Sequence, residues 1–452
     1  MSRLASELPL PLPIDIAPFR DAYLRVRSKF ALAMLASLMW FALTAWIAWP
    51  WMKDLAALLS WPAALLIVGG IALVPGLMNA FLAASLMLDR RPRRRLFARY
   101  PGVSILIAAF NEEHLIFETL SSIALQDYAG EFEVLVIDDG STDRTASIVE
   151  GVKFPWLRLL RQPKNMAKSA ALNRGLAEAR FDLIITLDAD SSLYAGALRN
   201  LVGRYLSDPP GTKAVAGTML VRNSRANWVT RAQEWDYFHG IAAVKRMQSL
   251  FHGTLVAQGA FSLYEREALE EVGGWEECVG EDIVLTWAML ARGWRIGHAE
   301  DACCFTNAPD RLGTFVRQRR RWARGMMEAF RRHPRILLVR RMSTFFVCWN
   351  LLFPWLDFAY TVAFIPGVVL ALFGIYWIAG AMTLALLPMA LLMNGLMYRI
   401  SVKMFDAQGL RVRRNISGFL LYVFAYSLVL QPVSAAGYVS EFLGLRKSWG
   451  TK

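Results

Sequence analysis

The middle of this 452-residue chain contains three groups of acidic residues whose positions suit chemistry on a charged substrate. Two groups follow short apolar segments, and the third opens a segment with a helical pattern. The members are Asp138 and Asp139, Asp188 and Asp190, and Glu281 and Asp282. A carboxylate can bind a divalent cation or take a proton from an attacking hydroxyl. These positions therefore indicate a reactive site, whereas the alternative for each acid alone is a strand end that faces water.

Asp188 and Asp190 have the spacing that a metal site needs. In an extended segment, side chains two residues apart point to the same side. Two carboxylates on one side repel each other unless a cation lies with them, and magnesium-type sites use one or two carboxylates together with substrate phosphates. We therefore expect Asp190, together with Asp188, to bind a divalent metal, Mg²⁺ or Mn²⁺.

Positive charge for a phosphorylated substrate is offered by the sequence Gln318-Arg319-Arg320-Arg321-Trp322. When a bond to a diphosphate breaks, the developing negative charge must be neutralised, and arginine and a metal ion can do this together. The indole of Trp322 could stack on the apolar face of a sugar ring. The alternative for the arginines alone is a solvated surface or one that binds lipid headgroups.

Other catalytic patterns are absent from the sequence. The five histidines are scattered, and neither a Ser-His-Asp nor a Cys-His arrangement is present. No GxGxxG or Walker A motif occurs, which argues against a dinucleotide oxidoreductase and a P-loop ATPase. The cysteines form no metal-ligand pattern, and we expect reduced, structural thiols. They are Cys278, Cys303, Cys304 and Cys348.

Alternating strands and helices must position these residues. Apolar runs predict strands over 103–109, 132–137, 157–160 and 183–187, and helices over 112–126, 141–151 and 168–179. This alternation predicts an α/β fold with a mostly parallel sheet that carries helices on both faces. Ligands of such sheets bind beyond the carboxyl ends of the strands, where the first two acidic groups lie.

Long apolar segments at both ends of the chain predict a membrane protein. Residues 30–52, 55–88 and 416–440 carry no charge, and 342–398 carries only Asp357. One crossing needs about 20 apolar residues. We therefore predict two transmembrane helices within 30–88. Within 341–452 we predict an interfacial segment and about three more helices, near 354–378, 380–398 and 417–440.

The net charge of +13 is concentrated beside these segments and predicts their orientation. Six arginines follow the second apolar run between 90 and 99, and eleven lie between 311 and 341. Under the positive-inside rule, the tail 1–29 and the domain 89–340 lie in the cytosol, beneath the cell inner membrane. Counting spans places the C-terminus outside, whereas Arg446, Lys447 and Lys452 favour the inside. The arginines lack interleaved aromatic residues, so we expect membrane lipids and no nucleic acid as partners.

The four motifs occur in the order found in membrane-embedded family 2 glycosyltransferases. The chain resembles poly-N-acetylglucosamine synthases, chitooligosaccharide synthases, hyaluronan synthases and cellulose synthases over about residues 100–335. The resemblance implies a GT-A nucleotide-sugar-binding domain and inverting transfer of a sugar. Three consecutive arginines replace the more varied middle of the last motif, so the role of Arg321 is assigned by position.

The resemblance implies a nucleotide site at the first strands. Asp138 or Asp139 would contact the uridine base, and Asn111 and Lys168 would lie near the nucleotide. Asp188 would hold the ribose or the diphosphate.

Transfer itself would take place beside that nucleotide site. Asp190 would hold the metal, and Asp282 would be the general base that takes the proton of the acceptor hydroxyl. The remaining residues would contact the diphosphate or the acceptor. They are Gln318, Arg321, Trp322, Glu281 and Gly259.

These expectations lead to a polysaccharide synthase that uses a UDP-sugar, with UDP-N-acetylglucosamine as the favoured donor. An accessory export partner could assist such an enzyme. A non-processive enzyme that glycosylates a lipid, as ceramide glucosyltransferases do, is the alternative. A transporter or scaffold with a degenerate nucleotide-binding domain is a third interpretation, but coupled transporters commonly carry several intramembrane charges.

Overall fold

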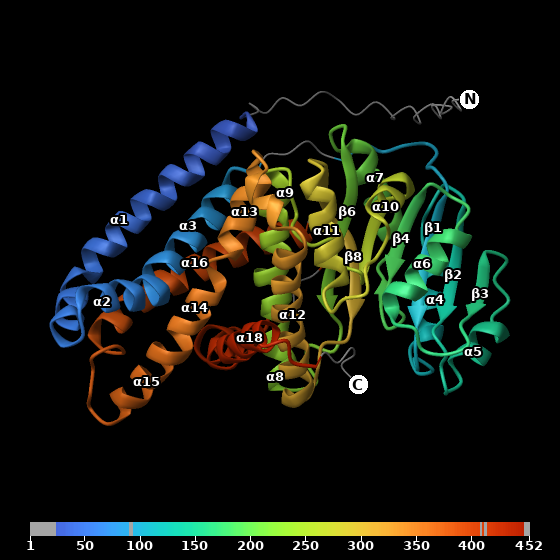
Figure 1. The fold of residues 1–452 in the computed structure, drawn as a ribbon. Helices are drawn as coiled ribbons and strands as arrows, with labels where there is room; N and C mark the ends of the chain where they lie inside the picture. Colours follow the sequence, from blue (N-terminus) through green and yellow to red (C-terminus); the bar gives the residue numbers. More distant parts are fainter. Residues whose placement is uncertain (1–23, 90–93, 407–408, 411–413, 447–452) are drawn as a thin grey trace.

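The computed structural model describes residues 24–89, 94–406, 409–410 and 414–446. It consists of an α/β domain and a set of apolar helices from the two ends of the chain, which lie together on one side of that domain (Figure 1). Three of the arginines beside the second apolar run, most of the N-terminal tail, Lys447 and Lys452 are outside the described residues.

One mixed sheet of eight strands forms the centre of the α/β domain, in the order β3-β2-β1-β4-β7-β6-β8-β5. The strands are β1 (Val103–Ala109), β2 (Phe132–Asp138), β3 (Leu157–Arg161), β4 (Leu183–Leu187), β5 (Ser192–Leu193), β6 (Thr212–Val221), β7 (Phe261–Glu265) and β8 (Arg295–Thr306). Strands β1 to β4 pair in parallel, as do β6 and β8, whereas β7 is antiparallel to both β4 and β6. The parallel arrangement expected from the sequence therefore holds for the first half, and the insertion of β7 makes the whole sheet mixed.

Helices cover both faces of this sheet. They are α4 (Ile116–Ala124), α5 (Thr145–Gly151), α6 (Lys168–Glu178), α7 (Ala197–Ser207), α10 (Arg266–Val272), α11 (Glu281–Ala291) and α12 (Leu312–Arg332). Side chains alternate along a strand. Accordingly, Ile105 and Ile107 of β1 pack in one cluster with α4, α5 and α7, and Leu106 packs in the other with α6, α10 and α11.

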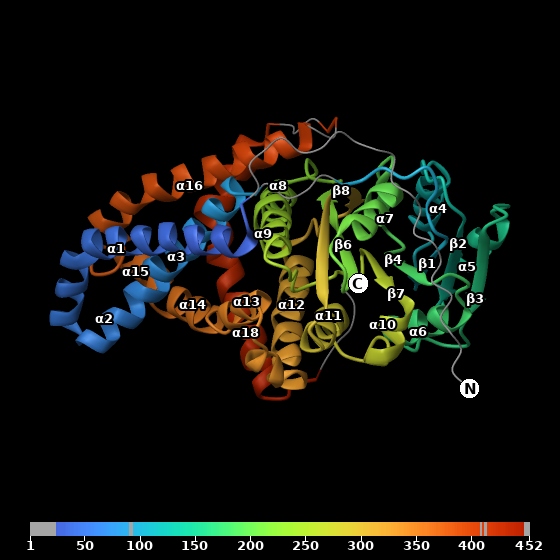
Figure 2. The ribbon, with the colours of Figure 1, turned by 90° about the horizontal axis from the view of Figure 1, so that it is seen from above.

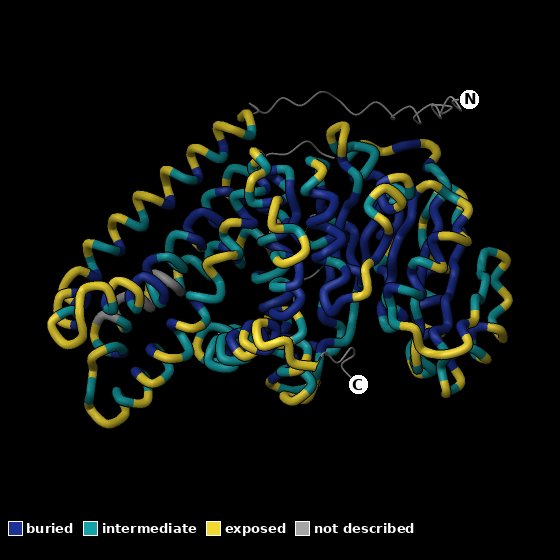
Figure 3. Tube along the Cα trace, viewed as in Figure 1, coloured by how far each residue is buried: buried dark blue, intermediate teal, exposed yellow. Residues whose placement is uncertain are grey.

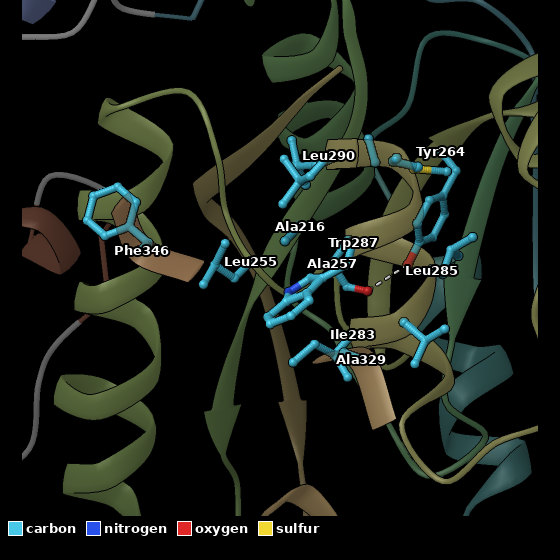
Figure 4. Packing of buried hydrophobic residues seen from close by; sticks show 14 of the residues in the cluster. Ala216, Leu255, Ala257, Tyr264, Ile283, Leu285, Trp287, Leu290, Ala329 and Phe346 are labelled. Atoms are coloured by element: carbon cyan, nitrogen blue, oxygen red, sulfur yellow. Dashed lines mark hydrogen bonds between the residues drawn. The ribbon is translucent and has the colours of Figure 1, made fainter. Parts of the chain in front are cut away.

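The second cluster joins the sheet to the helices that follow it (Figure 4). Trp287 of α11 is fully buried there, and its ring meets that of Phe330 of α12 edge to face with centroids 4.7 Å apart. In the same cluster the Tyr264 hydroxyl donates a hydrogen bond to the Ala257 carbonyl at 2.7 Å. This packing sets the position of α11 and α12 relative to the carboxyl ends of the strands.

A helix broken by a π-helical turn leads from β6 to the side of the domain on which the apolar helices lie (Figure 1). It consists of α8 (Trp228–Trp235), the turn Asp236–Ala243 and α9 (Val244–Leu250). After α12, a 3₁₀ turn over Pro334–Leu338 leads to α13 (Met342–Asn350). All three free cysteines of the α/β domain are buried, namely Cys278, Cys303 and Cys304, and Cys348 of α13 is exposed.

The apolar helices begin with α1 (Val26–Leu58), followed by α2 (Trp61–Val68), a π-helical turn and α3 (Val74–Met87). After α13 come α14 (Phe353–Ala359), α15 (Ile365–Leu372), α16 (Ala381–Asp406), α17 (Ile416–Leu421) and α18 (Ser427–Phe442). By length and composition, Val26–Leu58, Trp61–Met87, Met342–Leu372 and Ile416–Phe442 could each cross a membrane. Along α1, many apolar side chains are exposed, in contrast to the buried strands (Figure 3).

These helices do not all run in the same direction. Helices α1, α3 and α16 extend away from the α/β domain, whereas α18 runs across them, as the two ribbon views show (Figures 1 and 2). Between α15 and α16, the Trp377 carbonyl accepts a hydrogen bond from the indole of Trp51 at 3.0 Å, near the far end of α1. The 373–380 connection therefore lies at the end of the bundle away from the α/β domain.

Candidate active site

The loops that follow β1 and β2 are tied to each other. Asn111 has a left-handed backbone conformation (φ 56°), and its side-chain oxygen accepts a hydrogen bond from the Thr142 backbone at 2.9 Å. Its own backbone N–H donates to the Ser141 hydroxyl at 3.0 Å. The side chain of Asn111 thus holds the turn after β2 in place beside the carboxyl end of β1.

Asp138 and Asp139 are both buried at the end of β2. Asp138 accepts a hydrogen bond from the Ser141 backbone at 3.2 Å, which shapes the turn. Asp139 accepts one from the Met166 backbone at 2.8 Å and thereby connects β2 to the loop before α6. Burial raises the pKa of Asp139, because a charged carboxylate loses its hydration there.

Lys168, the first residue of α6, joins two of the acidic groups. Its ammonium lies 2.5 Å from an oxygen of Asp188 and 3.8 Å from an oxygen of Glu281. A Cβ on Gly259 would stand 3.0 Å from this ammonium, so only glycine lets the lysine pass without a tight contact. Burial lowers the pKa of Lys168, but the charges of Asp188 and Glu281 outweigh it and raise the pKa above its ordinary value.

Asp190 lies in a strongly anionic surrounding. Burial, followed by the charges of Asp188 and Glu112, raises the pKa of Asp190 to about 6. A cation at this point would remove the repulsion that the proton otherwise relieves. Among the described residues, no group of three or more His, Cys, Asp or Glu side chains is arranged as metal ligands. A hard divalent cation bound by Asp190 and Asp188 would take its other ligands from a substrate diphosphate and water.

The next two acids begin α11. Burial raises the pKa of Glu281 to about 7, and the Lys168 charge opposes that rise. Asp282 is only half-buried, and one of its oxygens accepts a hydrogen bond from the Ile283 backbone at 2.7 Å. The loop before them is held by α12, where the buried Glu328 carboxylate accepts hydrogen bonds from the backbones of Val279 and Gly280 at 2.9 and 3.0 Å.

Helix α12 carries the basic motif. Trp322 is 38% exposed, and its ring lies 4.0 Å from the guanidinium of Arg319. Arg319 is buried and lies 2.8 Å from Asp236. The Gln318 side-chain oxygen is buried and has no hydrogen-bond partner in the described part of the chain, which leaves an acceptor for a ligand.

The structure brings the predicted residues into one region. Asp139 contacts the 166–167 turn, Lys168 bridges Asp188 and Glu281, and the charge of Arg321 acts on Glu281. Asp190 joins this region through Asp188, and Asp282 adjoins Glu281. Asn111 and Asp138 support the turn after β2 by accepting hydrogen bonds from the Thr142 and Ser141 backbones.

Several residues that shape the site do not stand out in the sequence. Tyr237 is buried in the π-helical turn, with its ring 6.5 Å from that of Trp322. Burial raises the pKa of Tyr237, and the charges of Arg319, Asp236, Asp190 and Arg321 also act on it. Asp236 contacts Arg319 of α12, and Glu328 of α12 contacts the loop before α11; in both pairs the partners are far apart in the sequence. In the sequence, Asp236 and Glu328 are recognisable only as charged residues inside an apolar or helical segment. This pattern does not identify the residues that they contact.

Comparison with known proteins agrees with this geometry. Residues 104–273 match the family model "Glycosyl transferase family 2". The chain is 32% identical, over 236 residues, to the poly-beta-1,6-N-acetyl-D-glucosamine synthase of Staphylococcus aureus (strain COL), covering 51% of this chain and 56% of that protein. The poly-beta-1,6-N-acetyl-D-glucosamine synthase of Staphylococcus epidermidis has the same identity and the same two coverages, over 233 residues. The aligned part thus spans about half the length of these relatives.

Among solved structures, the fold is similar to that of the mannosyltransferase PcManGT from Pyrobaculum calidifontis in complex with GDP-Man and Mn²⁺. The TM-score is 0.58 with 21% identity, over 85% of this chain and 99% of that chain. The similarity concerns the fold and agrees with a GT-A-like α/β domain. Residues 104–273 are thus similar to family 2 glycosyltransferases, and the fold of the domain that contains them is GT-A-like.

Proposed function

We propose that the chain transfers N-acetylglucosamine from UDP-N-acetylglucosamine to a growing polysaccharide, with inversion, at the inner face of the cytoplasmic membrane. The arrangement that carries this proposal is the convergence of Lys168, Asp188, Glu281 and the neighbouring Asp190 beyond the carboxyl ends of β2 and β4. The choice of sugar rests on the similarity to synthases whose names state it.

Donor binding combines cationic and anionic groups. Lys168 and Arg321 supply positive charge for a diphosphate, and the turn carrying Asp138 and Asp139 forms the nucleotide side. Asp190, with Asp188, would hold a divalent metal, which supplies charge neutralisation to the departing nucleoside diphosphate when it is bound.

Asp282 is the proposed general base. As the acceptor oxygen bonds to the anomeric carbon, the bond from that carbon to the diphosphate breaks, and the acceptor proton passes to the Asp282 carboxylate. Asp282 suits this role because it is less buried than Glu281 and takes no part in the ion pairs of Lys168. Trp322, exposed in the middle of α12, would stack on the acceptor sugar.

Substitution of Asp282 tests the proposal. General-base assistance contributes about 10²–10⁴-fold, so Asp282→Asn should lose most turnover by roughly that factor. Donor affinity, measured by calorimetry with UDP-N-acetylglucosamine and Mn²⁺, should change little. Asp182→Asn is the matched control, because Asp182 is an exposed acid at the start of β4. Loss of donor binding in Asp282→Asn would remove Asp282 from the base role.

The product distinguishes the acceptor classes. Membranes containing the full chain would be incubated with labelled UDP-sugars in Mg²⁺ or Mn²⁺. A ladder of lengthening, water-soluble products supports a polysaccharide synthase, whereas a single chloroform-soluble product indicates transfer to a lipid. Full activity of the purified chain alone would show that an accessory export partner is unnecessary for synthesis.

The proposed placement in the membrane follows from the same arrangement. The cytosolic domain would comprise 89–340, which has access to nucleotide sugars, with the tail 1–29 on the same side. Two transmembrane helices within 30–88 precede it, and an interfacial segment and further apolar helices within 341–452 follow. The bundle would contact membrane lipids through the exposed apolar side chains of α1.

A further inference from the structure

The last apolar helix, residues 416–442, is called here the C-terminal helix and comprises α17, a π-helical turn and α18. Its 27 residues have the length and composition of a membrane span. At 1.5 Å per residue it is about 40 Å long, more than the hydrocarbon core needs. Composition alone therefore predicts a crossing, with its two ends on opposite sides of the membrane.

The first end of the C-terminal helix is bound to the glycosyltransferase domain. The Asn415 side chain caps the helix by accepting from Gly418, and it donates to the Arg231 carbonyl at 2.9 Å and to the Glu234 carboxylate at 2.5 Å. The indole of Trp235 donates to the Asn415 carbonyl at 2.9 Å. All three partners belong to α8, which directly follows the sheet.

The other end is bound to the same domain through α12. Glu441 is buried, with its carboxylate 3.2 Å from Arg324 and 3.4 Å from Arg331. The guanidinium of Arg324 also donates to the carbonyls of Leu445 at 2.6 Å and of Arg446 at 3.2 Å. The chain just beyond the helix is therefore held by the domain as well.

The groups that hold the two ends cannot lie on opposite sides of a bilayer. Helix α12 carries seven arginines, Arg317, Arg319, Arg320, Arg321, Arg324, Arg331 and Arg332, and it follows β8 directly. A single arginine at the centre of a bilayer already costs several kcal/mol by insertion scales, of order 3. Both α8 and α12 are therefore parts of the aqueous domain, and both ends of the C-terminal helix lie with them.

Between its ends the C-terminal helix has an inner and an outer face. The inner face packs closely on α12, where Phe315 and Tyr426 have ring centroids 5.5 Å apart and Gly437 lies against Ala323. Tyr438 donates to the Asp357 carboxylate of α14 at 2.8 Å, which connects it to the apolar bundle. The outer face exposes Ile416 (68%), Leu420 (48%), Phe424 (50%), Val439 (41%) and Phe442 (87%).

From this geometry we infer that the C-terminal helix lies in the plane of the membrane surface, with its outer face in the lipid and the C-terminus on the side of the glycosyltransferase domain. Helices of this kind bury their apolar side chains about 5–10 Å into the headgroup and acyl boundary. Helix α18 runs across α1 and α3, which agrees with a helix that lies in the membrane plane while α1 and α3 cross the membrane (Figures 1 and 2). The basic residues Arg446, Lys447 and Lys452 then follow the positive-inside rule.

Depth measurements along the helix test this placement. The full chain with Cys348→Ser would receive one cysteine at a time, at Leu420, Phe424, Val439 or Phe442, each labelled with a nitroxide in phosphatidylcholine–phosphatidylglycerol vesicles. The accessibility of each label to oxygen and to a nickel chelate gives its depth. Leu420 and Phe442 are about 33 Å apart along the helix. A surface helix gives similar shallow depths at all four positions; a depth that passes through the bilayer centre overturns the inference.

Helix α1 provides the matched control. Labels at Leu32, Leu38 and Trp46, which are all exposed on α1, should change in depth along the helix, because α1 extends away from the domain. Turnover retained by the labelled variants shows that they fold. The result does not depend on which sugar or acceptor is used, so the proposed activity and this placement can fail separately.

Labelling of spheroplasts tests on which side of the membrane the C-terminus lies. A membrane-impermeant maleimide should react with Tyr376→Cys, in the exposed connection between α15 and α16, and leave Lys452→Cys unlabelled until the membrane is permeabilised. Labelling of Lys452→Cys in intact cells would place the C-terminus outside and would contradict the inference.

Discussion

The contact between Gly437 and α12 allows one substitution to test how the C-terminal helix affects the active site. A Cβ at position 437 would lie 2.7 Å from the Cβ of Ala323 and 2.9 Å from the Arg320 carbonyl oxygen. Carbon atoms in contact prefer about 3.5–4.0 Å, so in Gly437→Ala the two helices must separate by about 1 Å. Arg320 and Ala323 flank Arg321 and Trp322 on α12 and must move with them.

Two effects of Gly437→Ala can be estimated. Overpacking costs about 1–3 kcal/mol, and the gain in helix propensity offsets up to about 1 kcal/mol of it, so the net destabilisation is roughly 0–3 kcal/mol. A displacement of about 1 Å in a positioning element can reduce turnover by as much as about 10²-fold. We therefore expect turnover to fall by one to two orders of magnitude, with a small decrease in the unfolding temperature.

The assay is sugar transfer and thermal unfolding of the purified full chain. Gly395→Ala on α16 is the matched control, because no atom lies within 4 Å of its Cβ position. The control should keep its turnover and gain up to about 1 kcal/mol of stability. If Gly437→Ala behaves like Gly395→Ala, the C-terminal helix does not pack on α12 in this way, and the reasoning is refuted.

Three further predictions concern the charges of the site. The pKa of Asp190 is raised to about 6, so below that pH Mn²⁺ must displace a proton to bind. The dissociation constant of Mn²⁺, measured by calorimetry, should rise about tenfold per pH unit below pH 6 and stay constant above it. A dissociation constant that does not level off above pH 6 would contradict the raised pKa. Asp236→Asn leaves the buried Arg319 without its carboxylate, at a cost of about 3–5 kcal/mol, so the unfolding temperature should fall by several degrees and the acceptor KM should rise more than the donor KM. Lys168→Met removes the cation between Asp188 and Glu281, so donor affinity should fall by about tenfold or more in calorimetry, whereas unchanged affinity would exclude Lys168 from the donor site.

Local patterns in the sequence were sufficient to predict the strands of the first half of the sheet and to identify the motifs. Apolar runs predicted β1 to β4 within one residue. For β1, β2 and β4 the reason is that a buried parallel strand needs a continuous apolar segment, whereas β3 contains two arginines and is only partly buried. Acids directly after such strands emerge at one edge of the sheet, which is why Asp139 and Asp188 could be expected in one site. Lys168 was expected there only from the family resemblance. The two N-terminal apolar helices also follow from composition, which determines whether a segment can be surrounded by lipid.

Only the tertiary structure decided how distant segments meet. The antiparallel insertion of β7 depends on strand pairing across the sheet, which no local pattern specifies. Glu441 could have been a solvated acid, but its partner Arg324 lies 117 residues earlier in the sequence. An apolar helix has the same composition whether it crosses the membrane or lies on its surface. The difference comes from the ion pairs and hydrogen bonds at its ends, and these require the folded domain to bring α8 and α12 to both ends of one helix.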